Sequence, residues 1–417
     1  MRRCSLLLVL MLMVLTISVN AAEQVTIVYQ NWTANEIPIE RELIREFEDT
    51  HPGIKIELAT TPVEQMHDKL LLLTRAGRAP DVMQTIPEWI VEFAENGVVA
   101  AMEDLLDPTE YEQFSSTFIP AAWGMAQWKT KTYGVPWRFG ASATFINSKL
   151  RREAGLPVPE KWTWDEFVDY AAKLTDASKG VYGFGVPGAS VDLGSSWCWS
   201  AFLFQNGGRL VDENGEVAID NEKAIEALEF YVGLLRDKQV MPPNTTSLSA
   251  KDITDLFGNN KLGMWQNGSW YIDTMKVAYP NLEFDVAPLP INVSDGSPAG
   301  GTLLSISPQT KNTKAALEFV RFMTSEEIIS KWAKSGHHMP PVEAVLNQPF
   351  MQEGPMSVFV AQAREPNTYV IGNLPEFTSL ATSLQVAIEK AFAGSSDPGQ
   401  ALKQAAAEWR EVMNKYK

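Results

Sequence analysis

Apolar residues recur along the first hundred residues with two different periods. They fill 25–29 and occupy every second position in 54–58, which indicates two strands. Between these strands, and again over 66–73, they lie three or four positions apart, which indicates helices. A third short strand is expected at 81–84. Strand and helix therefore alternate, as is typical of a parallel sheet with helices on both faces.

A second series of elements starts after residue 160. Thr163 and Glu166 have the spacing of a capping box at the start of a helix, and Ser249 is expected to cap a later helix. Residues 209–219 predict a hairpin with an Asn-Gly turn. Strands are expected at 181–186, 262–266 and 303–307, and the tail is predicted to be helical.

The stretch 133–147 is predicted to cross between two lobes. Gly134, Pro136 and Gly140 are expected to interrupt any regular element here, although an ordinary strand and turn with buried aromatic residues is the alternative. A second extended crossing is expected near 283–290, where two prolines argue against a place inside a sheet.

The amino terminus has the pattern of a secretory signal peptide over residues 1–21. Two arginines precede an apolar run at 6–19, which ends in small residues suited to cleavage near Ala21. We therefore expect an exported protein. After cleavage Cys198 is the only cysteine left, so no internal disulfide is expected.

Length and charge narrow the class of protein further. A chain of 417 residues predicts two or more domains. Its formal net charge of −16 disfavours binding to nucleic acid or anionic lipid. There are 13 tryptophans, and several stand beside Gly, Asn or Pro in predicted loops, where they could contact a ligand instead of packing in a core.

Two apparent motifs are discounted. Residues 183–188 fit the glycine pattern of dinucleotide-binding loops, but Pro187 and the lack of a following helix argue against that function. The pair 337–338 is not predicted to bind a metal, since no further ligands accompany the two histidines at a suitable spacing.

Five segments together resemble the extracellular solute-binding protein family 1, the maltose-binding-protein-like receptors of bacterial ABC sugar importers. Each match is short, but their order and spacing are specific and cover nearly all of the chain after the leader. They are Ala79–Gln84, Tyr133–Pro136 with Phe145–Leu150, Asn206–Leu210, Gly263–Trp265 with Asn267–Trp270, and Gly300–Gly301.

The resemblance implies a two-lobed α/β fold, the type II periplasmic-binding-protein fold, in which each lobe is a mostly parallel sheet flanked by helices. The amino-terminal lobe would consist of residues 22–136 and 286–334. The carboxy-terminal lobe would consist of residues 137–285 and 335–417. A third crossing would lie near 335–341.

The resemblance also implies a function. The protein would be a periplasmic monomer that captures a carbohydrate in the cleft between its lobes and delivers it to an ABC permease by hinge closure. No cofactor, metal or nucleic acid is expected. Aromatic rings would stack on the sugar faces while planar polar groups bind the hydroxyl rim.

Candidate ligand contacts come from the ends of predicted strands and from the crossings. Several have a structural alternative: Arg138 could form an internal ion pair, Asn267 could serve only its turn, and His338 could be a loop residue without a role. Trp197 and Trp199 are two positions apart on a helix, so at most one should face the cleft. The candidates are Asn31, Trp32, Glu36, Gln84, Trp137, Arg138, Trp197, Asn267, Trp270, Gly301 and His338.

Two other functions are compatible with the sequence. A pair of carboxylates in a sugar cleft is all that many glycosidases need, so an exported carbohydrate-active enzyme is one alternative. The same scaffold could also bind a non-sugar solute such as a polyamine or a phosphorylated compound. Polyamines need clustered carboxylates and phosphates need basic or helix-terminal donors, whereas the aromatic and amide residues at these strand ends favour a neutral sugar.

Overall fold

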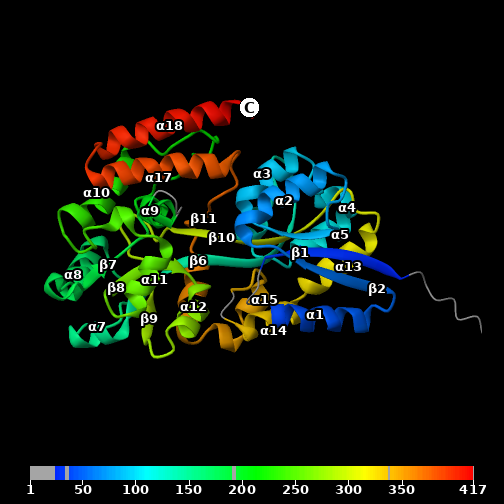
Figure 1. The fold of residues 1–417 in the computed structure, drawn as a ribbon, viewed down its shortest axis with the longest axis horizontal. Helices are drawn as coiled ribbons and strands as arrows, with labels where there is room; N and C mark the ends of the chain where they lie inside the picture. The colour runs from blue at the N-terminus through cyan, green and yellow to red at the C-terminus, as the bar shows by residue number, and fades with distance from the viewer. Residues whose placement is uncertain (1–23, 33–36, 190–193, 337–338, 417) are drawn as a thin grey trace, which may run out of the picture.

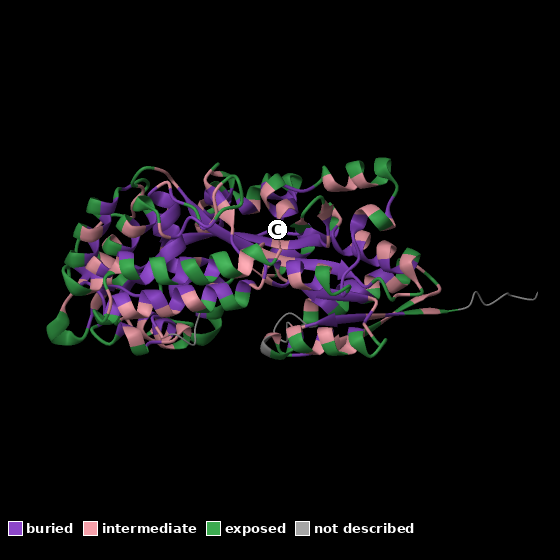
Figure 2. Cartoon of the chain, turned by 90° about the horizontal axis from the view of Figure 1, so that it is seen from above, coloured by how far each residue is buried: buried purple, intermediate pink, exposed green. Residues whose placement is uncertain are grey.

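The computed structural model describes residues 24–32, 37–189, 194–336 and 339–416. Within them the chain forms two lobes joined by two long strands, β6 (Val135–Asn147) and β10 (Ser297–Ile306). Both strands run through the middle of the molecule in Figure 1, with helices grouped at either end. Figure 2 shows that the sheet is buried and that the helices carry most of the exposed surface.

The first lobe is built around β1, β2 and β3, and the second around β7, β8, β9 and β11. The other strands are β1 (Val25–Asn31), β2 (Ile54–Thr60), β3 (Val82–Thr85), β4 (Gln127–Trp128), β5 (Lys131–Thr132), β7 (Tyr182–Phe184), β8 (Leu262–Gly268), β9 (Phe284–Ala287) and β11 (Thr368–Val370). The helices include α1 (Ile37–Thr50), α2 (Val63–Arg75), α3 (Pro87–Glu95), α9 (Gly194–Gln205), α14 (Glu326–Ser335), α17 (Phe377–Ala393) and α18 (Pro398–Asn414). The remaining helices are α4 (Met102–Leu105), α5 (Pro108–Ser115), α6 (Pro120–Gly124), α7 (Ser148–Glu153), α8 (Trp164–Leu174), α10 (Glu222–Arg236), α11 (Ala250–Gly258), α12 (Tyr271–Ala278), α13 (Thr313–Met323), α15 (Glu343–Leu346) and α16 (Gly354–Arg364).

One nine-stranded sheet passes through both lobes of the described chain, in the order β2-β1-β3-β10-β6-β8-β7. Strand β11 pairs with β10, and β9 pairs with β6. Pairing is parallel among β1, β2 and β3 and between β7 and β8, but antiparallel where β10 and β6 meet each other and their neighbours β3 and β8. The sheet is therefore parallel at its two ends and antiparallel in the middle.

The strand directions bring the two lobes together at their carboxyl ends. Strand β3 is antiparallel to β10 whereas β11 is parallel to it, so these two strands point toward each other along the same side of β10. Strands β7 and β8 run in the opposite direction to β1, β2 and β3. This follows because the pairs β3–β10, β10–β6 and β6–β8 are each antiparallel, whereas β7 and β8 are parallel. Ligands of open α/β sheets bind beyond the carboxyl ends of strands, and here two such edges face each other.

The structure corrects the prediction for the first crossing. Residues 135–147 form one uninterrupted strand instead of a broken segment. Pro136 is tolerated because it lies at an irregularity in the pairing with β10, between Thr302 and Leu303, where a missing N–H costs little. The second predicted crossing is also different: Phe284–Ala287 is the paired strand β9, and the later strand β10 joins the lobes.

Local signals were more reliable than these long-range ones. Thr163 with Glu166 and Ser249 with Asp252 both form capping boxes. The predicted 209–219 hairpin is present as a tight turn with one bridge between Val211 and Val217. Such signals lie within a few residues of each other in sequence, so they can be recognised without knowing the fold.

Candidate functional site

Two tryptophans from the second lobe lie against the sheet where the lobes meet. Trp197 on α9 and Trp270, directly before α12, pack edge to face with ring centroids 6.0 Å apart and planes at 73°. The Trp197 Nε1–H donates to Ser142 Oγ at 2.8 Å, which fixes that ring. Trp270 is 39% exposed, so much of its ring is open to a ligand. Edge-to-face pairs of this kind add about 0.5–1.5 kcal/mol beyond their burial.

Three glycines form the floor beneath these rings. A β-carbon at Gly140 would lie 3.0 Å from the Trp270 ring, one at Gly300 would lie 3.3 Å from the Trp197 ring, and one at Gly268 would overlap the Trp270 ring. Gly300 pairs with Gly140 across β10 and β6, and Gly268 pairs with Ser142 across β8 and β6. All of them therefore share one face of the sheet, and the absent side chains make room for the indoles.

Polar side chains continue the same face toward the first lobe. Thr302 lies two residues after Gly300 on β10 and is paired with Arg138, which lies two residues before Gly140 on β6. Gln84 on β3 pairs with Leu304, so it is the diagonal neighbour of Thr302. We call Gln84, Thr302 and Arg138 the polar row. The sheet thus changes from this polar row to the Trp197–Trp270 pair within a few residues.

Two of these polar residues carry buried atoms without a hydrogen-bond partner among the described residues. They are Gln84 Nε2 and Thr302 Oγ1. The other end of the Gln84 amide is engaged, because its Oε1 accepts from the Trp32 N–H at 3.4 Å. The Arg138 guanidinium lies over the Trp332 ring at 5.2 Å from its centroid. A ligand group at this point would meet polar atoms that the protein itself leaves available.

The structure brings together four of the predicted contacts and places others in the core. Gln84, Arg138, Trp197 and Trp270 share the face described above, as their register and ring contacts require. Trp137 is fully buried and packs against Trp332 with centroids 4.8 Å apart, which is the core placement of a crossing residue.

The remaining predicted residues have structural contacts of their own. Asn31 is fully buried and bonds Glu40 and Thr60, so it belongs to a polar network behind the first strand. Trp32 packs edge to face on Trp89 at 5.6 Å.

Asn267 and Gly301 also have local roles. Asn267 Oδ1 accepts from the N–H of Gly268 at 2.8 Å, as expected for a turn residue. Gly301 lies on the opposite face from Gly300, where a side chain would strike the Arg138 carbonyl. Glu36 and His338 lie outside the described residues.

Sequence reasoning missed Thr302 and Ser142. Each acquires its place only through pairing with a strand more than 100 residues away. The run Gly300-Gly301 was noticed, but the residue that follows it was not.

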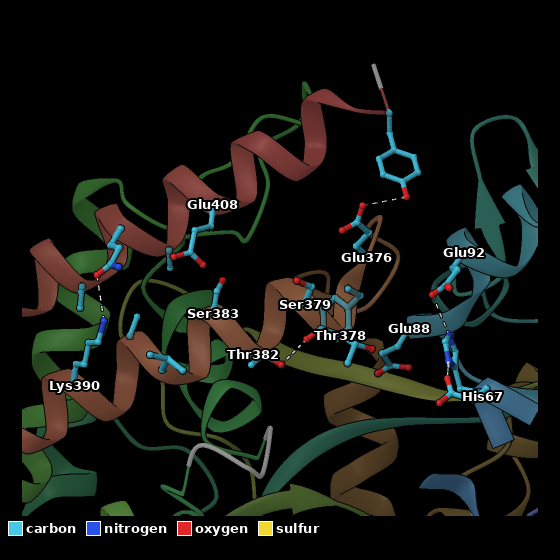
Figure 3. Close-up of a pocket in the computed structure, with 18 of the residues that line it drawn as sticks. His67, Glu88, Glu92, Glu376, Thr378, Ser379, Thr382, Ser383, Lys390 and Glu408 are labelled. Carbon is cyan, nitrogen blue, oxygen red and sulfur yellow. Dashed lines mark hydrogen bonds and ion pairs between the residues drawn. The ribbon is translucent and has the colours of Figure 1, made fainter. Parts of the chain in front are cut away.

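A polar groove of about 950 Å³ opens between the lobes beside α3, α17 and α18. In Figure 3 Glu88, Glu92 and His67 of the first lobe lie across from Thr378, Ser379 and Thr382 of α17. His67 contacts Asp68 and Glu92 at 2.9 and 3.0 Å. Gln385 ties this helix to α9, because its Oε1 accepts from the N–H of Ser196 at 3.0 Å, next to Trp197.

Glu88 lies where the two lobes touch in this groove. A β-carbon at Gly372, just after β11, would lie 3.0 Å from Glu88 Cγ. Burial raises the pKa of Glu88 to about 7. A second carboxyl with a raised pKa, also about 7, belongs to Glu365, which shares a hydrogen bond with Asp295 away from this groove.

Neither a metal centre nor a membrane span is found in the part of the chain that the structure describes. Its acidic, histidine and cysteine side chains form no group of three suited to a metal ion. Its helices are all too short or too polar to cross a bilayer.

Proteins of known sequence and structure are similar to this chain. The maltotriose-binding protein of Pyrococcus abyssi is 25% identical over 87% of this chain and 76% of its own length. An ABC substrate-binding protein of Listeria monocytogenes, solved in complex with cycloalternan, superposes with a TM-score of 0.80 at 25% identity, covering 94% of this chain and 99% of that one. A solute-binding protein of Thermotoga lettingae bound to α-D-tagatose shares the fold, with a TM-score of 0.81 at 24% identity over 93% of this chain and all of that one. The family model for bacterial extracellular solute-binding proteins matches residues 33–328, and the chain therefore belongs to that family.

Proposed function

We propose that this protein captures a sugar between its lobes and presents it to the membrane subunits of an ABC importer. The observation that carries the proposal is the Trp197–Trp270 pair on its glycine floor, at the place where strand ends of both lobes meet. A sugar ring has apolar C–H faces, which stack well on indole, and a rim of hydroxyls that needs planar polar partners.

The first lobe would supply those polar partners. Gln84 and Arg138 lie on the same face as the aromatic pair, and Trp32 holds Gln84 in place through its N–H. A relative named for maltotriose and a solved structure in complex with cycloalternan support a carbohydrate as the ligand class. A polyamine fits this set of groups less well, since Gln84, Thr302 and Arg138 include no carboxylate. A phosphorylated solute would find one basic group here, Arg138, whose guanidinium already lies over the Trp332 ring.

Hinge closure would couple capture to delivery. We assign residues 22–136 with 286–334 to one lobe and 137–285 with 335–417 to the other. A ligand favours the closed state only by the extra contacts it gains there, and those contacts would be the polar row on one side and the indoles on the other. The closed shape is then what the permease recognises.

The proposed setting is the periplasm. Membership of an extracellular family supports export, and residues 1–21 would be the leader removed near Ala21. The partners would be the carbohydrate and the permease subunits, with the receptor acting as a monomer.

The test is a fluorescence and thermal-shift screen of mono- and oligosaccharides, repeated with Trp270→Ala. We expect the wild type to respond to at least one sugar and the variant to lose that response while staying folded by circular dichroism. Trp128→Ala is the matched control, because Trp128 lies on β4, outside the strands and helices that carry the indole pair, and bonds Glu95. Unchanged affinity in Trp270→Ala would remove this residue from the site.

An exported carbohydrate-active enzyme is the second candidate. A carboxyl whose pKa is raised to about 7, such as Glu88, is the kind of group that donates a proton in glycoside cleavage. Chromatography of the best sugar after prolonged incubation distinguishes the two functions. We expect the sugar to be recovered intact, and turnover would replace the receptor proposal.

A further inference from the structure

We propose that Thr302 and Gln84 together bind one particular hydroxyl group of the ligand, and so determine which sugars this site selects. The inference rests on the proposed function and adds a specificity determinant to it. It starts from two polar atoms, Thr302 Oγ1 and Gln84 Nε2, that are enclosed yet bond to none of the described residues. Buried polar atoms are nearly always satisfied in folded proteins, so each such atom calls for a partner.

The two residues are close enough to act on the same ligand group. Gln84 and Leu304 are directly paired, and Thr302 is the next residue of β10 on that face. Diagonal neighbours in an antiparallel pair lie about 7–8 Å apart, with their β-carbons somewhat closer, and one hydroxyl group between the two side chains can bridge this gap. Arg138 is paired directly with Thr302 and borders the same spot.

The location is beside the aromatic pair. Gly300, which lies beneath Trp197, is two residues before Thr302 on the same face of β10. Gly140, beneath Trp270, is likewise two residues after Arg138 on β6. A ring stacked on Trp270 would therefore extend its rim toward Thr302 and Gln84.

The hydrogen-bonding chemistry points to a neutral hydroxyl. Gln84 Oε1 is already held by the Trp32 N–H, so the amide has its N–H donors left to offer. Thr302 can accept as well as donate. A sugar hydroxyl can accept from Gln84 and donate to Thr302 at the same time, whereas an ammonium group only donates and could not accept from Gln84.

The central experiment compares Thr302→Val with Thr85→Val. Both changes replace a hydroxyl by a methyl of similar shape. Thr85 Oγ1 is 2.8 Å from Ser305 Oγ, so its hydroxyl is satisfied within the protein. Without ligand, we expect Thr302→Val to melt at the same temperature as the wild type or higher, because it removes an unpartnered polar atom, whereas Thr85→Val should melt lower.

Binding is then measured for the best sugar of the screen and its series of monodeoxy analogues. Thr302→Val should weaken binding of the parent sugar by about tenfold, the cost of one good hydrogen bond. For one analogue of the series, which lacks the hydroxyl that Thr302 binds, wild type and variant should bind equally. Gln84→Met should also weaken binding of the parent sugar, and it should bind the same monodeoxy analogue as tightly as the wild type does. Thr85→Val should leave every affinity unchanged.

The outcomes separate this inference from the proposed function. If no sugar binds the wild type, both are overturned. If sugars bind but Thr302→Val weakens all of them equally, or none, then the two residues hold only a solvent molecule and the inference alone is overturned. A lower melting temperature for ligand-free Thr302→Val would also overturn it, because the hydroxyl would then have a partner inside the protein.

Discussion

The face of β6 and β10 that lies between the lobes has two halves of opposite character. Toward the first lobe it presents three polar residues, Gln84, Thr302 and Arg138. Two of them, Gln84 and Thr302, carry buried atoms that bond to none of the described residues. Toward the second lobe it presents glycines covered by Trp197 and Trp270. One half can bind a polar rim and the other an apolar face, and the change occurs over two residues of the same strands.

This difference explains how one sheet can bind a ligand that has both an apolar face and a polar rim. Side chains on one face of a strand recur every second residue, so a polar residue and a glycine can be neighbours there without any change in the backbone. The polar half binds with its own side chains, whereas the glycine half makes room for rings from α9 and from the residue before α12. Each half can therefore be broken separately.

The largest effect should come from filling the glycine floor. A β-carbon at Gly268 would overlap the Trp270 ring, so Gly268→Ala must displace the indole. We expect sugar affinity to fall at least about 30-fold, the loss of roughly 2 kcal/mol that a central aromatic contact supplies. Fluorescence titration measures this loss.

Gly300→Ala is the control for the glycine floor. Its β-carbon would lie 3.3 Å from the Trp197 ring, which can give by a few tenths of an ångström, so a much smaller loss is expected. Equal losses in the two variants would show that the floor does not position Trp270.

The next effect concerns Glu88, which lies between the lobes in the groove beside α3, α17 and α18. Because burial raises the pKa of Glu88 to about 7 from 4.5, the folded protein keeps this proton after the unfolded chain has lost it. The folded state thus binds more protons between these values, and its stability falls as the pH rises from about 4.5 to 7.

Glu88→Gln should remove this part of the pH dependence. Relative to the wild type, the variant should gain about 3 kcal/mol of unfolding free energy at pH 8 and nothing at pH 4. Urea denaturation at the two pH values measures the difference. Glu365 contributes a slope of the same sign to both proteins, so only the difference between them is informative. Identical pH profiles would mean that Glu88 is solvated between the lobes.

How far the sequence predicted this arrangement depends on the distance over which each signal acts. The capping residues and the alternation of strand and helix were read correctly, because their signals lie within one element. The two-lobed fold was predicted from the order of motifs. The continuous strand through Pro136 and Gly140 was not, since its regularity comes from pairing with β10, about 160 residues away.

The tryptophans illustrate the same limit. Trp137 and Trp270 both stand beside turn-forming residues in sequence, yet one is fully buried and the other is 39% exposed. Trp197 and Trp199 were expected to differ, and they do, because residues two apart on a helix point in different directions: Trp199 is buried, whereas Trp197 lies over Gly300. Helical geometry explains why Trp197 and Trp199 point in different directions. Only the tertiary structure explains why Trp137 is buried and Trp270 is exposed.

The smallest effect should distinguish the ring of Trp197 from its hydrogen bond. Trp197→Phe keeps an aromatic ring over Gly300 but loses the 2.8 Å bond from Nε1 to Ser142 Oγ. A hydrogen bond of this kind contributes about 1 kcal/mol, so we expect sugar affinity to fall about fivefold as the ring becomes less well fixed. Calorimetric titration is sensitive enough to measure it. Trp199→Phe on the same helix is the matched control. Its indole is fully buried, so the smaller ring should leave a cavity and lower stability while affinity stays constant. If Trp197→Phe bound as tightly as the wild type, the glycine floor alone would be enough to hold the pair, and Ser142 would have no part in the site.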